Sequence, residues 1–505
     1  MTDQIPGSLA HLYSKIGDLA TFLDDYKALV ECHLVDFITH DFFANLLPLD
    51  VGEALLKLSD DELAQLPSCQ PLFDNLRSRN QSTDRKSFDP LINFLDHCYR
   101  FNLKQLLNDP ILKKYLASPD DVCRKRKLKI TYCTDEKKCH EVEEMASAVA
   151  TMAQSMGTDL IVDIGSGRGY LGSLLAMYYG LRVFGFDSSD CNTHSANQRL
   201  ERVQKDWRTA LRRAGIDVNK SGRAVDENPN SPSCGVGQEV SKSTKGAYQP
   251  ITCPVTATTD LNQAIDNGRI ADSIDQSLVL CGLHTCGDLA SQTLRMFVEC
   301  HRAKGVLSVG CCYHLMEEQF AKNPFRNEDD PPPDFYGFPM SRYFQAKKYA
   351  IGRNGRLLAQ QPISKMAEKT VLPEQALHWR ALLQQLIWRK LQCRIDIFEK
   401  RVGRVAKNCS SFQEYVPRAL RKLGLEFKIS NEEINQFEVE YESYKRKMTA
   451  FFQLRCALAQ VLETFILMDR LCYLLEQDGI ESAKVIPLFD PVVSPRCYAV
   501  WSIKR

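Results

Sequence analysis

Apolar residues change their spacing along this chain, and the first region has the spacing of helices. From residue 1 to about residue 135, apolar side chains recur every three or four residues, as in Leu19–Cys32 and Pro90–Leu107. This spacing gathers them on one helical face, so residues 1–135 are predicted to form an N-terminal helical region. Ser59 followed by Glu62 is typical of a capping box at a helix start.

From about residue 159 the pattern changes to short apolar runs that alternate with helical segments. Such runs are typical of strands buried on both faces of a parallel sheet. Their alternation with helices predicts right-handed crossover connections. The predicted strands are Leu160–Ile164, Leu181–Asp187, Ile251–Thr258, Leu278–Gly282 and Gly305–Gly310.

The last part of the chain returns to helices and then to strands. Residues 366–478 have helical spacing, whereas Ala483–Phe489 and Cys497–Ile503 flank a turn as an antiparallel hairpin does. We therefore predict an α/β fold with a Rossmann-like sheet. Its first part spans residues 136–365, a helical insertion follows at 366–478, and a terminal hairpin at 479–505 completes the sheet.

Residues 219–250 interrupt the predicted sheet. They are rich in Ser, Gly, Lys, Pro and Asn and contain few apolar side chains. A segment of this composition cannot bury enough apolar surface to offset the entropy cost of ordering. We therefore predict a disordered insertion here.

Composition narrows the class of protein only a little. The 505 residues carry a formal net charge of +1, so no overall field favours nucleic acid or a membrane surface. The 19 cysteines lack CxxC spacing, and the N-terminus lacks the pattern of a signal peptide. No uninterrupted apolar run approaches the roughly 18 residues that span a bilayer. We expect an intracellular protein, in the cytoplasm or nucleus, without a membrane partner.

A glycine-rich turn between the first predicted strand and the next helix is the most informative segment. It has the spacing GxGxG, whereas dinucleotide-binding turns have GxGxxG. The acid ahead of it would repel a pyrophosphate but suits a cation, such as the sulfonium of S-adenosyl-L-methionine. The residues predicted to bind this cofactor are Asp163, Gly165, Gly167, Gly169 and Tyr170. A ligand-free tight turn and a nicotinamide or flavin site are the alternatives.

Two more acids extend the predicted cofactor site. Asp187 ends the second strand, where an acid can accept hydrogen bonds from both ribose hydroxyls. Asp260 follows the third strand, near the expected adenine, but it is equally suited to cap the helix that begins at Leu261. The helix expected over Lys137–Met152 adds Lys138, His140 and Glu141, which are placed to reach the cofactor or the substrate, and His140 is predicted to bind the cofactor. The alternative is that all three are surface charges on a helix.

The loops after the fourth and fifth strands carry the candidate catalytic residues. Ligands of open α/β sheets lie beyond the carboxyl ends of the strands, so both loops face the transferred methyl group. His284 and Asp288 follow the fourth strand, and His314 follows the fifth. Because histidine titrates near neutral pH, either histidine is a candidate base for a hydroxyl acceptor. The alternative is that both histidines are structural.

Thiols cluster in the same two loops. Cys286, Cys311, Cys312 and His314 offer ligands that zinc accepts. Adjacent cysteines without CxxC spacing are unusual for zinc, so we predict no metal site. A basic run, Arg124–Lys129, is a candidate contact for RNA phosphates, although a solvated face or a localisation signal is the alternative.

Five motifs in this order resemble the methyltransferase-like protein 25 family, from about residue 90 to the end of the chain. They are Lys137-Lys-Cys-His-Glu141, Asp163-Ile-Gly-Ser-Gly-Arg-Gly-Tyr-Leu171, Leu283-His-Thr-Cys-Gly-Asp-Leu289, Gly310-Cys-Cys-Tyr-His314 and Asp490-Pro-Val-Val-Ser-Pro-Arg496. The resemblance implies a Rossmann-like class I fold and an S-adenosyl-L-methionine-dependent methyltransferase. One branch of the family is named for ribosomal RNA adenine dimethylation. The Asn-Pro-Pro-aromatic motif of adenine N6 methyltransferases is absent here.

A more distant resemblance concerns the catalytic domain alone. A tRNA ribose 2′-O-methyltransferase also has a His-x-Cys-Gly segment and a Cys-Cys-His segment in these two loops, which favours a hydroxyl acceptor. RNA is therefore the first expected substrate. A protein or small-molecule substrate, or an inactive cofactor-binding interaction protein, is the alternative.

Overall fold

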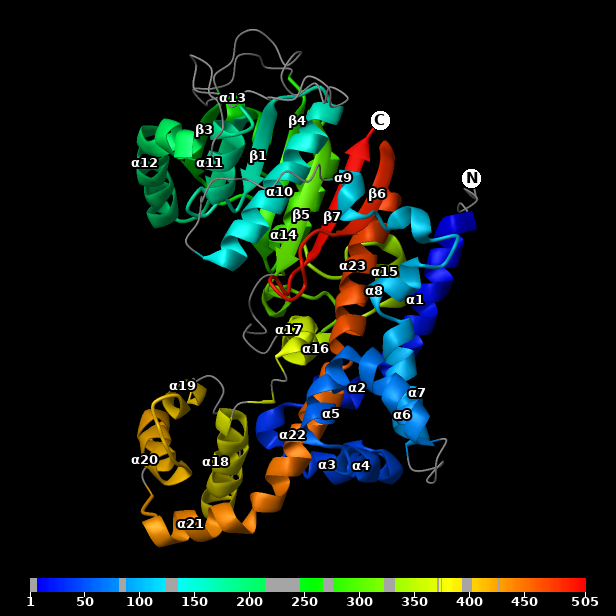
Figure 1. Cartoon of the computed structure of the whole chain (residues 1–505), viewed down its shortest axis with the longest axis vertical. Helices are drawn as coiled ribbons and strands as arrows, with labels where there is room; N and C mark the ends of the chain where they lie inside the picture. Colours follow the sequence, from blue (N-terminus) through cyan, green and yellow to red (C-terminus); the bar gives the residue numbers. More distant parts are fainter. Residues whose placement is uncertain are drawn as a thin grey trace. The chain divides into compact units, whose positions relative to one another are not determined.

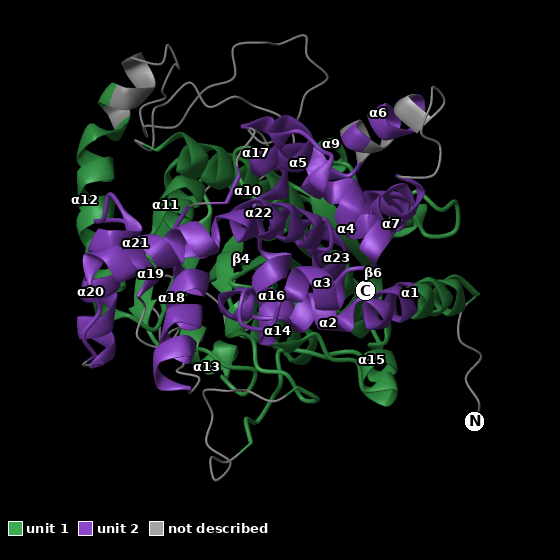
Figure 2. Cartoon of the chain, turned by 90° about the horizontal axis from the view of Figure 1, so that it is seen from below, with its two compact units in different colours: residues 1–18, 106–352, 464–505 green, residues 19–105, 353–463 purple. Residues whose placement is uncertain are grey.

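The fold is described from a computed structural model of the 505-residue chain. The structure describes residues 7–80, 88–122, 135–213, 246–266, 276–321, 332–369, 372–373, 375–392, 402–425 and 427–505. These residues form two compact units (Figure 2). Unit 1 comprises Met1–Asp18, Leu106–Gly352 and Thr464–Arg505, and unit 2 comprises Leu19–Gln105 and Arg353–Glu463.

Unit 1 is built on a seven-stranded sheet with the order β3-β2-β1-β4-β5-β7-β6 (Figure 1). The first five strands pair in parallel, and β7 joins β5 and β6 in antiparallel pairing. This arrangement confirms the predicted Rossmann-like sheet with a terminal hairpin. The strands are β1 (Leu160–Ile164), β2 (Arg182–Asp187), β3 (Ala247–Thr252), β4 (Leu278–Cys286), β5 (Ala303–Cys311), β6 (Ile480–Pro487) and β7 (Tyr498–Lys504).

Helices pack on this sheet in the order that the alternating sequence pattern predicts. The long helix α10 lies against β4 and β5, α11 and α12 lie against β2 and β3, and α14 lies against β4 and β5. The helices of this region are α8 (Leu103–Leu107), η3 (Lys113–Tyr115), α9 (Pro119–Val122), α10 (Glu136–Ser155), α11 (Tyr170–Met177), α12 (Asp190–Arg213), α13 (Leu261–Asp266), α14 (Leu289–Glu299), η4 (Tyr313–Leu315) and α15 (Arg342–Lys347).

The central strands are buried on both faces, which is why their sequences lack a polar alternation. All five residues of β1 are buried, including Ile161 and Val162 at 0% exposure. Each fully buried aliphatic side chain of this kind contributes about 1.5–3 kcal/mol to folding. The sheet is therefore a rigid base for the loops at the carboxyl ends of its strands.

Unit 2 is helical in its described part. Side-chain caps mark helix starts in this unit, such as the capping box of Ser59 and Glu62 that the sequence predicts at the start of α5. Its helices are α2 (Lys27–Glu31), η1 (Leu34–Asp36), α3 (Phe42–Leu46), α4 (Leu49–Leu56), α5 (Asp60–Gln65), η2 (Leu66–Ser68), α6 (Gln70–Asn80), α7 (Asp89–Arg100), α16 (Gly352–Ala359), α17 (Ile363–Glu368), α18 (Gln375–Leu391), α19 (Gly403–Ala406), α20 (Phe412–Leu423), α21 (Asn431–Glu440) and α22 (Glu442–Cys456). The chain passes between the units within helices α1 (Gly7–Asp25), α8, α16 and α23 (Ala459–Leu475).

The compact units divide the chain at other places than the predicted segments do. Most of the N-terminal helical region joins part of the helical insertion in unit 2. The end of that insertion, from Thr464, belongs instead to the unit that contains the sheet.

The third strand also departs from the prediction. It covers Ala247–Thr252, so the predicted disordered insertion at 219–250 is wrong at its end. The physical reason is Tyr248, which is only 6% exposed and packs into the core of unit 1. Residues 219–245 lie outside the described part of the chain.

One described helical stretch, Glu442–Leu475, has the length and apolar composition of a membrane span. In its most apolar 18-residue window, 89% of the residues are buried inside the chain. Burial of this kind is also found in core helices of proteins outside membranes. The expectation of no membrane partner therefore stays a prediction.

Candidate active site

The glycine-rich turn between β1 and α11 has the backbone that its sequence predicts. Gly165, Gly167 and Gly169 all have positive φ, at 72°, 55° and 70°. Glycine adopts this left-handed conformation without the steric cost that a Cβ brings. The amides of Gly165 and Ser166 both donate to the carbonyl of Phe186 in β2, at 2.8 and 3.0 Å. The turn is thus fixed against the neighbouring strand.

Asp187 at the end of β2 also holds the turn in place. Its Oδ2 accepts a hydrogen bond from the Gly167 amide at 2.9 Å. Its Oδ1 accepts from the Ser189 amide at 2.9 Å and from the Asn192 side chain at 3.0 Å. Because a carboxylate accepts about four hydrogen bonds, these three leave Asp187 able to accept one more from a ligand.

Asp163 is a buried acid next to this carboxylate. Only 2% of the residue is exposed. Burial, with a smaller contribution from the charge of Asp187, raises the pKa of Asp163 to about 8. The two acids that the sequence assigns to the cofactor are therefore close enough to interact. An acid in this position gains its charge most readily when a cation lies beside it.

The glycines of the turn do not all have the same role. A Cβ built on Gly167 would meet only the Gly165 carbonyl, at 4.0 Å, so it would extend into open space. A Cβ on Gly169 would lie 2.7 Å from the Tyr248 ring and 2.9 Å from the Ala196 methyl group. Gly167 is therefore open to a ligand, whereas Gly169 allows close packing between helix and strand.

Tyr248 was missed by the sequence analysis because it lies in the segment assigned to disorder. Cβ atoms on Gly172 and Gly185 would also collide with its ring, at 2.3 and 2.7 Å. Three glycines, from the turn before α11, from α11 and from β2, thus contact one aromatic side chain. An isolated tyrosine beside a low-complexity stretch gives no signal from which this packing can be predicted.

Tyr170 and Asp260, both predicted to bind the cofactor, contact other residues of the chain. The Tyr170 ring has the guanidinium of Arg199 at 3.5 Å and the ammonium of Lys138 at 4.5 Å from its centre. Asp260 accepts from the amides of Asn262 and Gln263, at 3.0 and 3.1 Å, and so caps α13. For Asp260, the helix-cap alternative accounts for these contacts.

His284 lies in a distortion of β4. Its φ is 63°, and the pairing of β4 with β5 shifts register between Leu283 and Thr285. A positive φ is uncommon for a residue with a side chain, and such conformations are concentrated at functional sites. The bulge leaves 36% of the His284 side chain exposed. It also re-aims that side chain away from the regular alternation of the strand.

A buried carboxylate orients His284. Glu141 of α10 is 3% exposed, and its Oε2 lies 2.8 Å from His284 Nε2. The other oxygen, Oε1, accepts a hydrogen bond from the hydroxyl of Ser494 at 2.6 Å and lies 3.6 Å from Lys137 Nζ. Burial raises the pKa of Glu141, but the hydrogen bond and charge of His284, the Ser494 hydroxyl and Lys137 together hold it below its ordinary value.

His140 contacts the loop between β6 and β7. Its Nε2 accepts a hydrogen bond from the Asp490 amide at 2.9 Å, and its ring packs against Phe489. The neighbouring Glu141 reaches Ser494 in the same loop. Two adjacent motif residues thus fix the loop between β6 and β7. The sequence predicted a cofactor contact for His140, and it named Glu141 among the residues able to reach the cofactor or the substrate.

The other predicted catalytic residues lie in the loops that follow β4 and β5. Asp288 Oδ1 accepts from the Glu317 amide at 3.0 Å, and a Cβ on Gly337 would lie 1.9 Å from the same oxygen. Asp288 therefore contacts both the segment at Glu317 and the segment at Gly337. His314 lies in η4, directly after β5, as the sequence places it.

Three thiols meet beside His284. The Sγ atoms of Cys286, Cys311 and Cys312 lie within 4.8 Å of one another, and those of Cys286 and Cys311 are 3.1 Å apart. A hydrogen bond from Cys311 lowers the pKa of Cys286 to about 6 against the opposing effect of burial, and Cys312 and the charge of His284 add smaller contributions in the same direction as Cys311. The pKa of Cys311 is raised by the same hydrogen bond and by burial.

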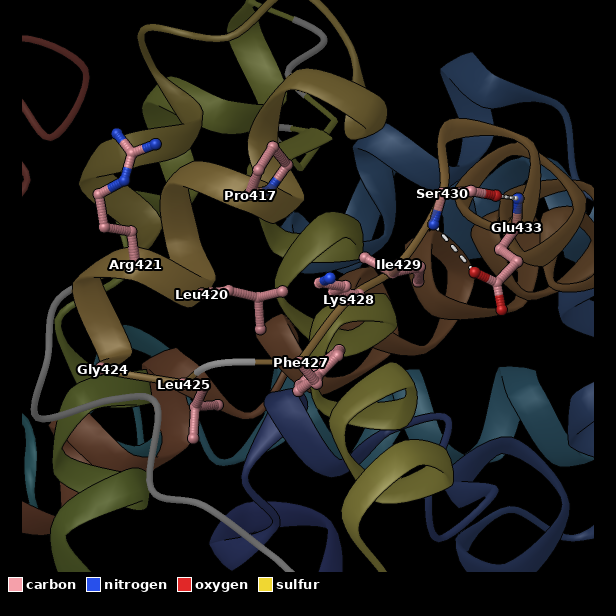
Figure 3. A pocket seen from close by; sticks show the side chains of 10 residues that line it. All are labelled: Pro417, Leu420, Arg421, Gly424, Leu425, Phe427, Lys428, Ile429, Ser430 and Glu433. Carbon is pink, nitrogen blue, oxygen red and sulfur yellow. Dashed lines mark hydrogen bonds between the residues drawn. The ribbon is translucent and has the colours of Figure 1, made fainter.

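A separate pocket of 790 Å³ lies in unit 2, at the junction of α20 and α21 (Figure 3). Its lining residues include Leu420, Phe427 and Lys428. Ser430 and Glu433 form a capping box on its α21 side. None of the residues predicted for the cofactor or for catalysis lines this pocket.

The comparison with protein families agrees with the geometry of unit 1. Residues 137–319 match a family model described as a methyltransferase domain. This range contains Glu141, the glycine turn, Asp187, His284 and the three thiols. No solved structure matches the chain.

Curated relatives extend the similarity to nearly the whole chain. One is "Probable methyltransferase-like protein 25" of Mus musculus, 31% identical, with 98% of this chain and 97% of the relative covered. The protein of the same name from Homo sapiens is 30% identical, with 98% of each chain covered. Identity at this level over this length confirms the predicted family. The chain belongs to the methyltransferase-like protein 25 family and is a methyltransferase.

Proposed function

We propose that this methyltransferase takes its methyl group from S-adenosyl-L-methionine and transfers it to a hydroxyl group of RNA, with His284 as the general base. The observation that carries the proposal is the hydrogen-bonded pair of Glu141 and His284 at the carboxyl end of β4. The ribose 2′ hydroxyl is the acceptor that this chemistry favours.

The described residues fit the proposed cofactor. S-adenosyl-L-methionine supplies a methyl group on a sulfonium and carries positive charge beside a ribose. Asp163 is a buried acid that gains charge beside a cation, and Asp187 retains capacity for one more hydrogen bond. Gly167 leaves open space in front of the turn. Together they provide a charge partner, a hydroxyl partner and room for a ligand.

Glu141 sets the proton positions of His284. A carboxylate is an acceptor, so a neutral imidazole facing it carries its proton on Nε2. Nδ1 is then the nitrogen that accepts a proton from an acceptor hydroxyl. As the proton arrives, the buried Glu141 carboxylate stabilises the imidazolium that forms. An amine acceptor would not need this arrangement, because its lone pair is already available.

The choice of RNA as the proposed substrate rests on the sequence. The resemblance of the two cysteine- and histidine-containing loops to a tRNA ribose 2′-O-methyltransferase supports an RNA hydroxyl. The basic run Arg124–Lys129, proposed as a phosphate contact, lies outside the described residues. Every cysteine in the described ranges is a free thiol, in keeping with a proposed location in the reducing cytoplasm or nucleus.

A methyl-transfer assay tests the proposal. Purified full-length protein is incubated with tritiated S-adenosyl-L-methionine and with RNA or protein fractions from cells that lack it. We expect label in RNA that resists alkaline cleavage, which marks a 2′-O-methyl group, and no label with His284→Ala. Label in protein alone, label in an RNA base, or undiminished labelling by His284→Ala would contradict the proposal. An absence of label with every fraction would point to an inactive cofactor-binding protein.

A further inference from the structure

The three thiols beside His284 come from two neighbouring strands. Cys286 ends β4, Cys311 ends β5, and Cys312 follows directly. Cys286 and Cys311 are partners in the parallel ladder. All three Sγ atoms lie within 4.8 Å of one another. Cys286 is exposed, so the cluster is accessible from solvent.

Two unusual backbone conformations bring the thiols together. Adjacent residues of a strand point to opposite faces, so a regular strand would separate the side chains of Cys311 and Cys312. Cys312 has φ 50° and ψ 48°, and this left-handed turn gathers the two thiols. The bulge at His284 shifts the register so that Cys286 pairs with Cys311. Without that extra residue, Cys286 would be one position out of register.

We propose that Cys286, Cys311 and Cys312 bind one zinc ion, with a fourth coordination position left open to solvent or to an acceptor group. This proposal goes beyond the proposed function and departs from the expectation of no metal site. The CxxC spacing that the sequence lacks is unnecessary here, because the sheet itself brings the ligands together.

The donor set suits zinc better than harder cations. Zinc accepts thiolate sulfur at about 2.3 Å in tetrahedral sites, which places two ligand sulfurs roughly 3.8 Å apart. The Sγ atoms of Cys286 and Cys311 are 3.1 Å apart and all three lie within 4.8 Å of one another, so small side-chain shifts give this spacing. The cysteines coordinate the metal as thiolates, so those that are still protonated give up their protons to solvent and binding releases protons.

The coordination number also follows from the surroundings. Among the described residues, no histidine or carboxylate joins the three thiols within the same distance limit. His284 Nε2 already faces Glu141. Three protein ligands with one open position is the pattern of catalytic zinc sites, whereas structural sites are closed by four.

Cobalt substitution tests this site without any methyl-transfer assay. Reduced full-length protein is stripped with a chelator and titrated with Co²⁺. Thiolate-to-cobalt charge-transfer absorption and strong tetrahedral d–d bands report binding. Added Zn²⁺ should then displace Co²⁺ and remove these bands. We expect saturation near about one equivalent of Co²⁺. Isothermal titration with Zn²⁺ in two buffers of different ionisation enthalpy should reveal the released protons.

Two ligand variants and one matched control complete the test. Cys286→Ser and Cys312→Ser should each weaken Co²⁺ binding by more than the roughly 10–100-fold cost of losing an outer-shell contact. Cys191→Ser, an exposed thiol at the start of α12, should bind as the wild type does. Circular dichroism checks the folding of all three variants, and Cys286 is exposed and so tolerant of serine.

No charge-transfer band in reduced wild type, or an unchanged band in both ligand variants, would overturn the proposal. Formation of a Cys286–Cys311 disulfide on mild oxidation, without metal binding by the reduced protein, would overturn it too.

Discussion

Positive φ angles occur at both ends of the candidate site, at the turn after β1 and at the ends of β4 and β5, but in different kinds of residue. At the turn after β1, the left-handed residues are glycines, and the conformation carries no side-chain strain. At the ends of β4 and β5, the left-handed residues are His284 and Cys312, which bear the groups expected to do chemistry. A left-handed conformation of this kind costs about 1–3 kcal/mol, and it persists only where the surroundings enforce it.

The difference separates a binding end from a reacting end. The first end is a backbone cradle with two acids, and it is suited to hold a cofactor without moving. The second end is held in a strained form by contacts from distant segments, above all by Glu141 and Ser494. Variants at the first end should therefore change cofactor affinity, and variants at the second end should change turnover.

The largest effect is expected at the reacting end, from His284→Ala. Loss of a general base typically lowers kcat by about 10²–10⁴-fold. Affinity for S-adenosyl-L-methionine should stay within about twofold of wild type, a factor worth under about 0.5 kcal/mol. His314→Ala serves as the comparison from the neighbouring loop, and single-turnover methyl transfer is the measurement. If His314→Ala is the more damaging variant, the base has been assigned to the wrong loop.

Glu141→Gln should have the next largest effect, because Glu141 acts through His284. The amide keeps the shape and an acceptor oxygen but removes the charge, so kcat should fall by about 10–100-fold. KM for the acceptor should change little, because the residue contributes to the transition state and not to acceptor binding. Steady-state kinetics separates the two parameters. A rise in KM with unchanged kcat would indicate a purely structural role for Glu141.

At the binding end, Gly167→Ala should weaken cofactor binding by at least about tenfold, or about 1.4 kcal/mol. Gly180→Ala is a matched control, because Gly180 also has positive φ and open space around its Cβ position. Both variants should lose about 1–2 kcal/mol of folding stability from left-handed strain. Thermal denaturation and calorimetry measure the two effects. Equal affinities in both variants would show that the turn does not face the cofactor.

The smallest effect on methyl transfer at neutral pH is expected from Asp163→Asn, which changes mainly the pH dependence of stability. The pKa of Asp163 is raised to about 8 in the folded, ligand-free protein, above the ordinary value of 3.8. A raised carboxyl pKa means that ionisation destabilises the folded state progressively between these two pH values. The asparagine variant should therefore gain stability relative to wild type as pH rises from about 4 to about 8. The gain should then level off.

Cofactor affinity should show the complementary pH dependence. In wild type the affinity should increase as pH rises toward about 8, because Asp163 must lose its proton to face the sulfonium. In Asp163→Asn that dependence should disappear. Calorimetry between pH 6 and pH 9 gives the slopes, and parallel slopes for the two proteins would remove Asp163 from the binding site.

The binding end could be predicted from sequence because its signal is local. A strand, three glycines and a second acid follow one another within Asp163–Asp187, and the backbone that they require is the one observed. The same reasoning assigned Gly169 to the cofactor, but it could not show that Tyr248 packs against this glycine. The cofactor contact of Gly169 stays a prediction. Tyr170 was likewise assigned without knowledge of Arg199 across its ring.

The reacting end could not be predicted in the same detail because its contacts join distant parts of the chain. The loops were placed correctly after β4 and β5, and His284 was among the candidates. His284 and its partner Glu141 are 143 positions apart in the sequence, and Glu141 and Ser494 are 353 positions apart. The bulge that sets the orientation of His284 depends on the register of two strands, and residue spacing alone does not encode it.

Calorimetric titration of S-adenosyl-L-methionine into the full-length chain tests the division of the site most directly. Saturable binding is expected for wild type, with weakened binding for Asp187→Ala and undiminished binding for His284→Ala. Absence of binding to folded wild-type protein would contradict the account, as would an equal loss of affinity in both variants.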